Sequence, residues 1–135
     1  MTPAEVVAGY LAAFDDADPD AIARWVTHDF VNEHTAALGG GCVGRDAYRS
    51  RLPGFLAMFA QLHYDVDEIV ADGDRSVAAY TMHAEFRGSP TTVRGVMRFV
   101  VHGDEIAHRT DYWDSLQFLL QVDPEVRTQL AHWLP

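Results

Sequence analysis

The chain has 135 residues, of which 48% are hydrophobic, a composition that predicts one folded domain over residues 1–135 and excludes a disordered chain. Its formal net charge of -10 repels phosphate backbones and anionic lipid headgroups, which argues against nucleic acid and membrane surfaces as partners. The single cysteine, Cys42, excludes an intrachain disulfide. The sequence shows no secretory signal pattern and no run of about eighteen apolar residues, so we expect a cytoplasmic protein.

Two helices are expected at the start of the chain. Thr2 and Glu5 have the spacing of a capping box, and apolar residues then recur at helical spacing as far as Phe14. Asp18 is placed to cap a second, shorter helix whose apolar face would include Trp25. Two short amphipathic helices of this kind are expected to pack against each other in antiparallel fashion.

A short strand, a loop and a longer helix follow. Residues 30–35 have extended character, and the glycine-rich segment 39–44 after them predicts a loop. Residues 46–59 carry apolar side chains at helical spacing. The Pro53-Gly54 pair inside this segment predicts a helix in two parts, because proline removes a backbone hydrogen bond and clashes with the preceding turn.

The second half of the chain changes to the two-residue period of strands. Short turns rich in glycine and aspartate separate four such segments, which predicts an antiparallel meander. The predicted strands are residues 63–71, 75–86, 92–102 and 105–113. Two short helical pieces, residues 116–121 and 126–133, are expected to close the chain.

The last predicted strand contains a carboxylate at its centre. A half-buried strand alternates apolar and polar residues, and burying an unpartnered acid costs several kcal/mol or raises its pKa. Strand parity places Arg109, Asp111 and Trp113 on one face. Asp111 is therefore the first candidate for a catalytic acid or base. The alternative is a structural ion pair between Asp111 and Arg109.

Two motifs resemble a known superfamily. One is the pair of segments at 103–106 (GDEI) and 111–114 (DYWD), and the other is VNEH at 31–34 before GRD at 44–46. With helices first and a curved sheet after them, the chain resembles the nuclear transport factor 2-like superfamily, which includes SnoaL-like polyketide cyclases, limonene-epoxide-hydrolase-like enzymes and ketosteroid-isomerase-like proteins. The resemblance implies an α+β fold, a cystatin-like cone in which N-terminal helices pack on a curved antiparallel sheet and enclose an apolar pocket.

The resemblance also implies which residues face the pocket. The Asp111 face of the last strand would point into the cone, as would Asn32 and His34 from the first strand. Asp111 would move a proton, while His34 and Asn32 would hold and polarise a substrate oxygen. Structural roles remain open for both, a backbone-bonded imidazole for His34 and a satisfied turn for Asn32. The other predicted pocket residues are Arg109, Trp113, Tyr80, Met82, Met97, Phe99, Phe55, Phe59 and Trp25, although most of the apolar ones suit the core better.

The predicted function is cofactor-independent acid/base catalysis on an apolar, oxygenated small molecule, by a cyclase, isomerase or dehydratase. Epoxide hydrolysis is one alternative, but the Arg-x-Asp pair that such enzymes carry on a middle strand would fall at residues 78–82, which hold no charge. Arg109 or Glu85 would have to replace that pair. A non-catalytic ligand-binding or dimerisation module is the other alternative.

No cofactor or metal is expected. The seven histidines show none of the spacings typical of metal sites, and the glycine-rich loop lacks the pattern of a phosphate-binding or dinucleotide-binding motif. By analogy with the superfamily we expect a homodimer, since a sheet covered by helices on one face leaves the other face for a partner.

Overall fold

Capping side chains set where the N-terminal helices begin. In the computed structural model, which describes all 135 residues, Thr2 and Glu5 form the predicted capping box at the start of α1 (Pro3–Ala12). A short 3-10 turn, η1 (Ala13–Asp16), extends this helix. The apolar stripe of α1 is fully buried, and it forms the helical side of the core.

The second helix differs from the prediction. α2 (Pro19–Ala23) ends before Trp25, and it packs chiefly against α3 (Arg45–Met58) rather than antiparallel to α1. The Trp25 ring lies directly on Gly9 of α1, so close that a side chain at Gly9 would overlap it. This contact holds the Trp25 ring against α1 at Gly9.

The α3 helix is continuous, so the predicted break at Pro53 is wrong. Pro53 removes one backbone hydrogen bond, but tertiary contacts hold the helix on both sides of it. Leu52 is buried against the core. At the start of α3, Arg45 donates to the Val26 carbonyl oxygen at 2.6 Å and to the Glu105 carboxylate at 2.8 Å.

Six strands form one sheet, and the predicted meander makes up most of it. The strands are β1 (Val26–His34), β2 (Cys42–Val43), β3 (Phe59–Asp72), β4 (Arg75–Phe86), β5 (Ser89–His102) and β6 (Glu105–Trp113). Their order is β2-β1-β6-β5-β4-β3, with β1 parallel to β6 and every other pair antiparallel. The β1/β6 register pairs Asn32 with Arg109 and His34 with Asp111. Residues from opposite ends of the chain therefore become neighbours.

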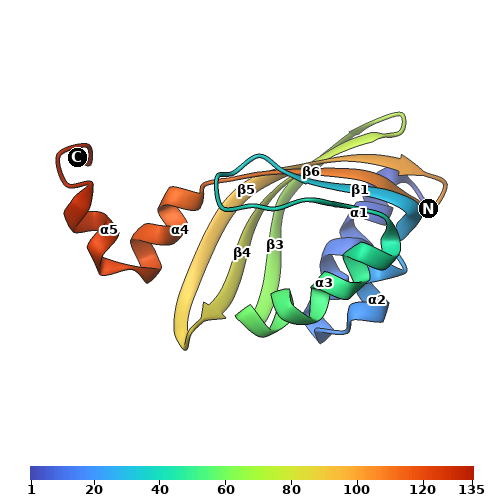
Figure 1. The fold of residues 1–135 in the computed structure, drawn as a ribbon. Coiled ribbons are helices and arrows are strands. Elements are labelled where there is room, and N and C mark those ends of the chain that lie inside the picture. The colour runs from blue at the N-terminus through green and yellow to red at the C-terminus, as the bar shows by residue number, and fades with distance from the viewer.

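The sheet curves around α1 and α3 to give the cone expected from the sequence (Figure 1). The C-terminal helices α4 (Ser115–Val122) and α5 (Pro124–Gln129) extend beyond one end of the sheet (Figure 1). Asp114 accepts a hydrogen bond from the backbone nitrogen of Gln117 at 3.0 Å and so caps the start of α4. No helix combines the length and the apolar character needed to span a membrane.

Candidate active site

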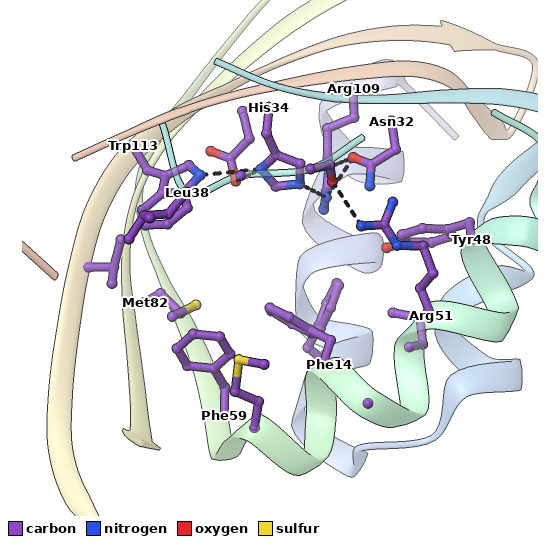
Figure 2. A pocket seen from close by; sticks show the side chains of 18 of the residues that line it. Phe14, Asn32, His34, Leu38, Tyr48, Arg51, Phe59, Met82, Arg109 and Trp113 are labelled. Atoms are coloured by element: carbon purple, nitrogen blue, oxygen red, sulfur yellow. Dashed lines mark hydrogen bonds and ion pairs between the residues drawn. The ribbon is translucent and has the colours of Figure 1, made fainter. Parts of the chain in front are cut away.

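A cavity of about 580 Å³ lies between the inner face of the sheet, α3 and the loop that follows β1. In Figure 2, the polar side chains gather along the strands, while Phe14, Phe59 and Met82 form an apolar wall opposite them. Most predicted pocket residues line this cavity. They are Asp111, His34, Asn32, Arg109, Trp113, Tyr80, Met82, Phe55 and Phe59.

Three predicted pocket residues lie elsewhere. Met97 and Phe99 are fully buried on the same face of the sheet, but under α1, where Phe99 packs edge-on against the Tyr10 ring. Trp25 is held on Gly9, away from the cavity lining. All three are corrections to the predicted site, because α1 closes this end of the cone and turns its side chains into core.

Asp111 is a buried carboxylate with one free oxygen. Asp111 is 5% exposed, and its Oδ1 atom accepts a hydrogen bond of 2.6 Å from the Tyr80 hydroxyl. Oδ2 makes no hydrogen bond and lies 3.9 Å from His34 Nδ1. Burial raises the pKa of Asp111, while the Arg109 charge and the Tyr80 hydrogen bond offset part of that rise. A raised pKa moves this carboxyl toward the range in which a side chain can act as a general acid or base.

Arg109 does not form an ion pair with Asp111. None of its nitrogens lies within 4.0 Å of the carboxylate. Its Nε and Nη2 atoms donate to Asn32 Oδ1 at 3.1 and 2.8 Å, and Nη1 donates to the Tyr10 hydroxyl at 2.6 Å. Three N–H groups of the guanidinium are thus bound by neutral acceptors, and the structural ion pair considered from the sequence is absent.

Gly95 makes room for the hydrogen bond between Tyr80 and Asp111. Tyr80 on β4 stands directly opposite Gly95 on β5, and its ring crosses Gly95 to reach β6. A Cβ at Gly95 would lie 2.5 Å from the Tyr80 hydroxyl and 2.6 Å from the Tyr112 carbonyl oxygen. Sequence reasoning missed this residue. A glycine inside a strand is itself a signal of close approach.

His34 lies between two hydrogen-bond donors. The Trp113 indole donates to its Nδ1 at 3.2 Å, and Arg109 Nη2 lies 3.5 Å from its Nε2 (Figure 2). Burial lowers the pKa of His34 to about 4, with the charges of Arg109 and Arg51 acting in the same direction. Because Nδ1 accepts from Trp113, the single proton of the neutral ring belongs on Nε2. His34 can therefore donate to a ligand oxygen.

The charge state of His34 is directly measurable. In an NMR titration that follows the ring nitrogens, His34 is expected to stay neutral as the pH falls through 6.5 and to become protonated only near pH 4. Arg51→Gln should raise the midpoint, since it removes one of the charges that disfavour the imidazolium. A His34 midpoint at or above 6.5 in the wild-type protein would contradict this electrostatic account.

Asn32 supplies two further donors. Its Oδ1 atom accepts twice from Arg109, which fixes the amide orientation, and its amide nitrogen makes no hydrogen bond within the protein. Asn32 lines the cavity, so these N–H groups are available to a ligand. His34 and Asn32 together present N–H groups to the cavity beside the carboxylate of Asp111, which is paired with His34 in the β1/β6 register.

Several residues of the site were not expected from the sequence. The hydroxyl groups of Tyr10 and Tyr48 form a buried hydrogen bond, and Tyr10 in turn accepts from Arg109. Arg51 reaches the cavity from α3. These residues were missed because Tyr10 and Tyr48 lie on apolar helical stripes, whose spacing predicts core, and Arg51 has the pattern of a solvated surface. Glu85, the proposed substitute acid for epoxide hydrolysis, does not line the cavity.

No group of three or more histidine, cysteine or acidic side chains is arranged to hold a metal ion. Arg51, Arg109 and Asp111 are the charged side chains of the cavity, and the rest of its lining is neutral at pH 7. The site can thus bind a mostly apolar molecule, donate hydrogen bonds to one of its oxygens, and exchange a proton at a buried carboxylate.

Comparison with solved structures identifies the same fold in several proteins. A ketosteroid isomerase-like protein from Catenulispora acidiphila, crystallised with trimethylamine, has a TM-score of 0.80 and 23% identity, and the alignment covers 90% of this chain and 93% of that one. A candidate polyketide cyclase from Xanthomonas campestris has a TM-score of 0.78 and 22% identity, and the alignment covers 90% of this chain and 96% of that one. An epoxide hydrolase of the limonene-epoxide-hydrolase type from M. tuberculosis has a TM-score of 0.77 and 17% identity, with 96% of both chains covered.

Identities this low establish the fold and not the reaction. Among curated proteins, none matches this sequence significantly. A family model does match, the SnoaL-like domain, and it aligns with residues 7–109, a span that includes Asn32, His34 and Arg109. The chain therefore belongs to the SnoaL-like domain family and has the nuclear transport factor 2-like fold.

Proposed function

We propose that this protein is a cofactor-independent enzyme that moves a proton on an apolar, oxygenated small molecule, as a cyclase, isomerase or dehydratase. The observation that supports it is the state of Asp111. This residue is the single carboxylate of a largely apolar cavity, its Oδ2 atom has no hydrogen bond, and N–H donors of Asn32 and His34 lie on the adjacent strand. Such a site suits enolate chemistry.

In the proposed reaction, ionised Asp111 removes a proton from a carbon next to a substrate carbonyl. The C–H bond breaks, its electron pair moves toward the carbonyl oxygen, and Asp111 holds the proton. The N–H groups of His34 and Asn32 stabilise the charge that develops on the oxygen. The enolate then takes the proton back at another carbon, or expels a hydroxyl group that leaves as water with the proton. Alternatively, it closes a ring by attacking a second carbonyl carbon, whose π electron pair moves to its oxygen, and that oxygen takes the proton from Asp111.

Trp113 and the phenylalanine rings around the cavity also have a role in this proposal. Phe55 and Phe59 form a tilted aromatic pair, and Trp113 packs edge-on against Phe118. These rings would keep water from the enolate and hold the apolar body of the substrate. Trp113 also fixes the ring of His34 through its indole N–H, so it positions the donor as well as lining the cavity.

Epoxide hydrolysis fits the cavity less well. Enzymes of that type have a second carboxylate in the site, whereas Asp111 is the single acidic residue that lines this cavity. Opening of styrene-type or terpene epoxides to diols is the assay for this alternative. A ligand that binds in the cavity without any turnover would instead support a binding module.

The proposal can be tested before the natural substrate is known. Proton abstraction next to a carbonyl exchanges hydrogen for deuterium in D₂O, and ¹H NMR detects this with simple bicyclic ketones such as 1-indanone and 2-tetralone. The wild-type protein is expected to accelerate this exchange above the buffer rate. If no ketone of a broad panel exchanges faster than in buffer while an epoxide is opened, the hydrolase alternative replaces this proposal.

A further inference from the structure

The cavity has an excess of positive charge, although the protein as a whole is strongly acidic. Two guanidinium groups, those of Arg51 and Arg109, face it together with one carboxylate, that of Asp111. The net charge of the full chain is -10. A cationic cavity in such a protein cannot be explained by average composition, so it points to the chemistry of the ligand.

The charge of Arg109 lacks a counter-ion in direct contact. Arg109 is 5% exposed, and the acceptors of its hydrogen bonds are the neutral groups of Asn32 and Tyr10. Three of its five N–H groups have these partners, which leaves one on Nη1 and one on Nη2. Burying a guanidinium is costly unless an anion compensates it, and no carboxylate lies within 4.0 Å.

Arg51 adds a second cation at the same part of the cavity. In Figure 2 its side chain rises from α3 toward the row formed by Arg109 and Asn32. It donates to the carbonyl oxygens of Gly41 at 2.6 Å and Gly40 at 3.2 Å, and it forms no ion pair. Two unpaired guanidinium groups that face one space repel each other, and a bound anion would relieve that repulsion.

The remaining walls describe the body of the ligand. Aromatic rings from η1, α3, β3 and α4 line the apolar side, among them Phe14, Phe55, Phe59 and Phe118. A cavity of about 580 Å³ falls within the size range of sites that enclose a small organic molecule. The donors lie at one side of the cavity and the rings at the other (Figure 2), which suits a molecule with one ionised end.

We infer that the ligand of this cavity is an apolar, ring-containing organic anion whose ionised oxygen lies against Arg109 and Arg51. This inference rests on the proposed function, because it takes the cavity as the substrate site. It adds the substrate class: the reacting carbonyl compound carries a carboxylate or an equally acidic oxygen. A neutral compound of the same shape would leave both guanidinium groups without a counter-ion in direct contact.

The test compares two probes of nearly identical shape, 2-naphthoate and the neutral 2-naphthamide, by isothermal titration calorimetry at pH 7. The wild-type protein should bind 2-naphthoate at least about tenfold more tightly, and added salt should weaken that binding but not the binding of the amide. Equal affinity for the two probes, or no binding of 2-naphthoate at millimolar concentration, would overturn the inference.

Variants of Arg51 separate its charge from its contacts with the loop. Arg51→Gln should lower the affinity for 2-naphthoate several-fold and leave that for 2-naphthamide unchanged. Arg51→Lys keeps the charge while changing the hydrogen bonds to Gly40 and Gly41, so it should retain most of the preference for the anion. Arg24, which is exposed and makes no ion pair, gives the matched control Arg24→Gln with wild-type affinity for both probes.

The two proposals fail in different ways. Asp111→Asn should bind 2-naphthoate as well as the wild type or more tightly, because it removes a like charge from the cavity. If the anion preference is found but Asp111→Asn exchanges ketone protons at the wild-type rate, the proposed function fails and the anion site stands. If exchange depends on Asp111 and the naphthalene probes bind equally, the anion site fails alone.

Discussion

Replacing Asp111 by asparagine is expected to lower the rate of proton exchange by roughly two to four orders of magnitude, the usual contribution of a positioned general base. The reason is local. Asparagine has the size of aspartate and can still accept the Tyr80 hydrogen bond, but its amide does not take up a proton near neutral pH. Binding of a neutral ligand should therefore change little, so the loss should appear in kcat.

Asp29 offers a matched control for this experiment. It is exposed, lies on β1 outside the cavity lining, and makes no hydrogen bond or ion pair, so Asp29→Asn changes the net charge by the same amount without touching the site. This control is expected to keep the wild-type exchange rate. Equal rates for Asp111→Asn and the wild type would refute the assigned role of Asp111.

Removing the Tyr80 hydroxyl is expected to move the acidic limb of the pH–rate profile to higher pH. The hydrogen bond from Tyr80 favours the ionised form of Asp111, so Tyr80→Phe raises the pKa of that carboxyl and leaves less of it ionised at a given acidic pH. Below the midpoint the rate should fall by roughly ten- to 100-fold, in line with about 1.5–3 kcal/mol for a hydrogen bond to a charged group. The measurement is the exchange rate as a function of pH.

Gly95→Ala should act on the same hydrogen bond from the other side. The added methyl group would meet the Tyr80 hydroxyl and the Tyr112 carbonyl oxygen, so the ring must move away from Asp111, with a cost of about 1–3 kcal/mol in stability. The pH–rate profile should shift as in Tyr80→Phe. In the double variant the two shifts should not add, because only one hydrogen bond is lost.

Tyr112 provides the control for the tyrosine substitution. It lies on β6 next to Asp111 but on the opposite face, is 42% exposed and makes no side-chain hydrogen bond. Tyr112→Phe is expected to leave the pH–rate profile unchanged. An unchanged profile in Tyr80→Phe, or additive shifts in the double variant, would show that Tyr80 does not control the ionisation of Asp111.

Much of the fold follows from local patterns in the sequence. The capping box at Thr2 and Glu5, the cap at Asp18 and the antiparallel meander all match the structure, because each depends on residues close together in the chain. The predicted break at Pro53 failed for the opposite reason. Packing of the helix against the core, which no local pattern reports, outweighs the missing backbone hydrogen bond.

The apolar part of the site could be predicted only incompletely. Met82, Met97 and Phe99 all have inward-facing parity on their strands, yet Met82 lines the cavity while Met97 and Phe99 are core. The difference is set by where α1 crosses the sheet, since it covers Phe99 with Tyr10 and leaves the other end of the cone open. Parity gives the face of a strand but not the position of the helix above it.

The sequence by itself determined that Asp111 shares a face with Arg109 and Trp113, because strand parity requires no partner. It could not determine whether Arg109 would pair with Asp111. The tertiary structure decides this through the parallel register of β1 and β6, which sets Asn32 beside Arg109, and through α1, which brings the Tyr10 hydroxyl to the same guanidinium. With three of its N–H groups held by these neutral acceptors, Arg109 makes no ion pair with Asp111, and the physical reason is a pairing across 77 residues that local sequence does not encode.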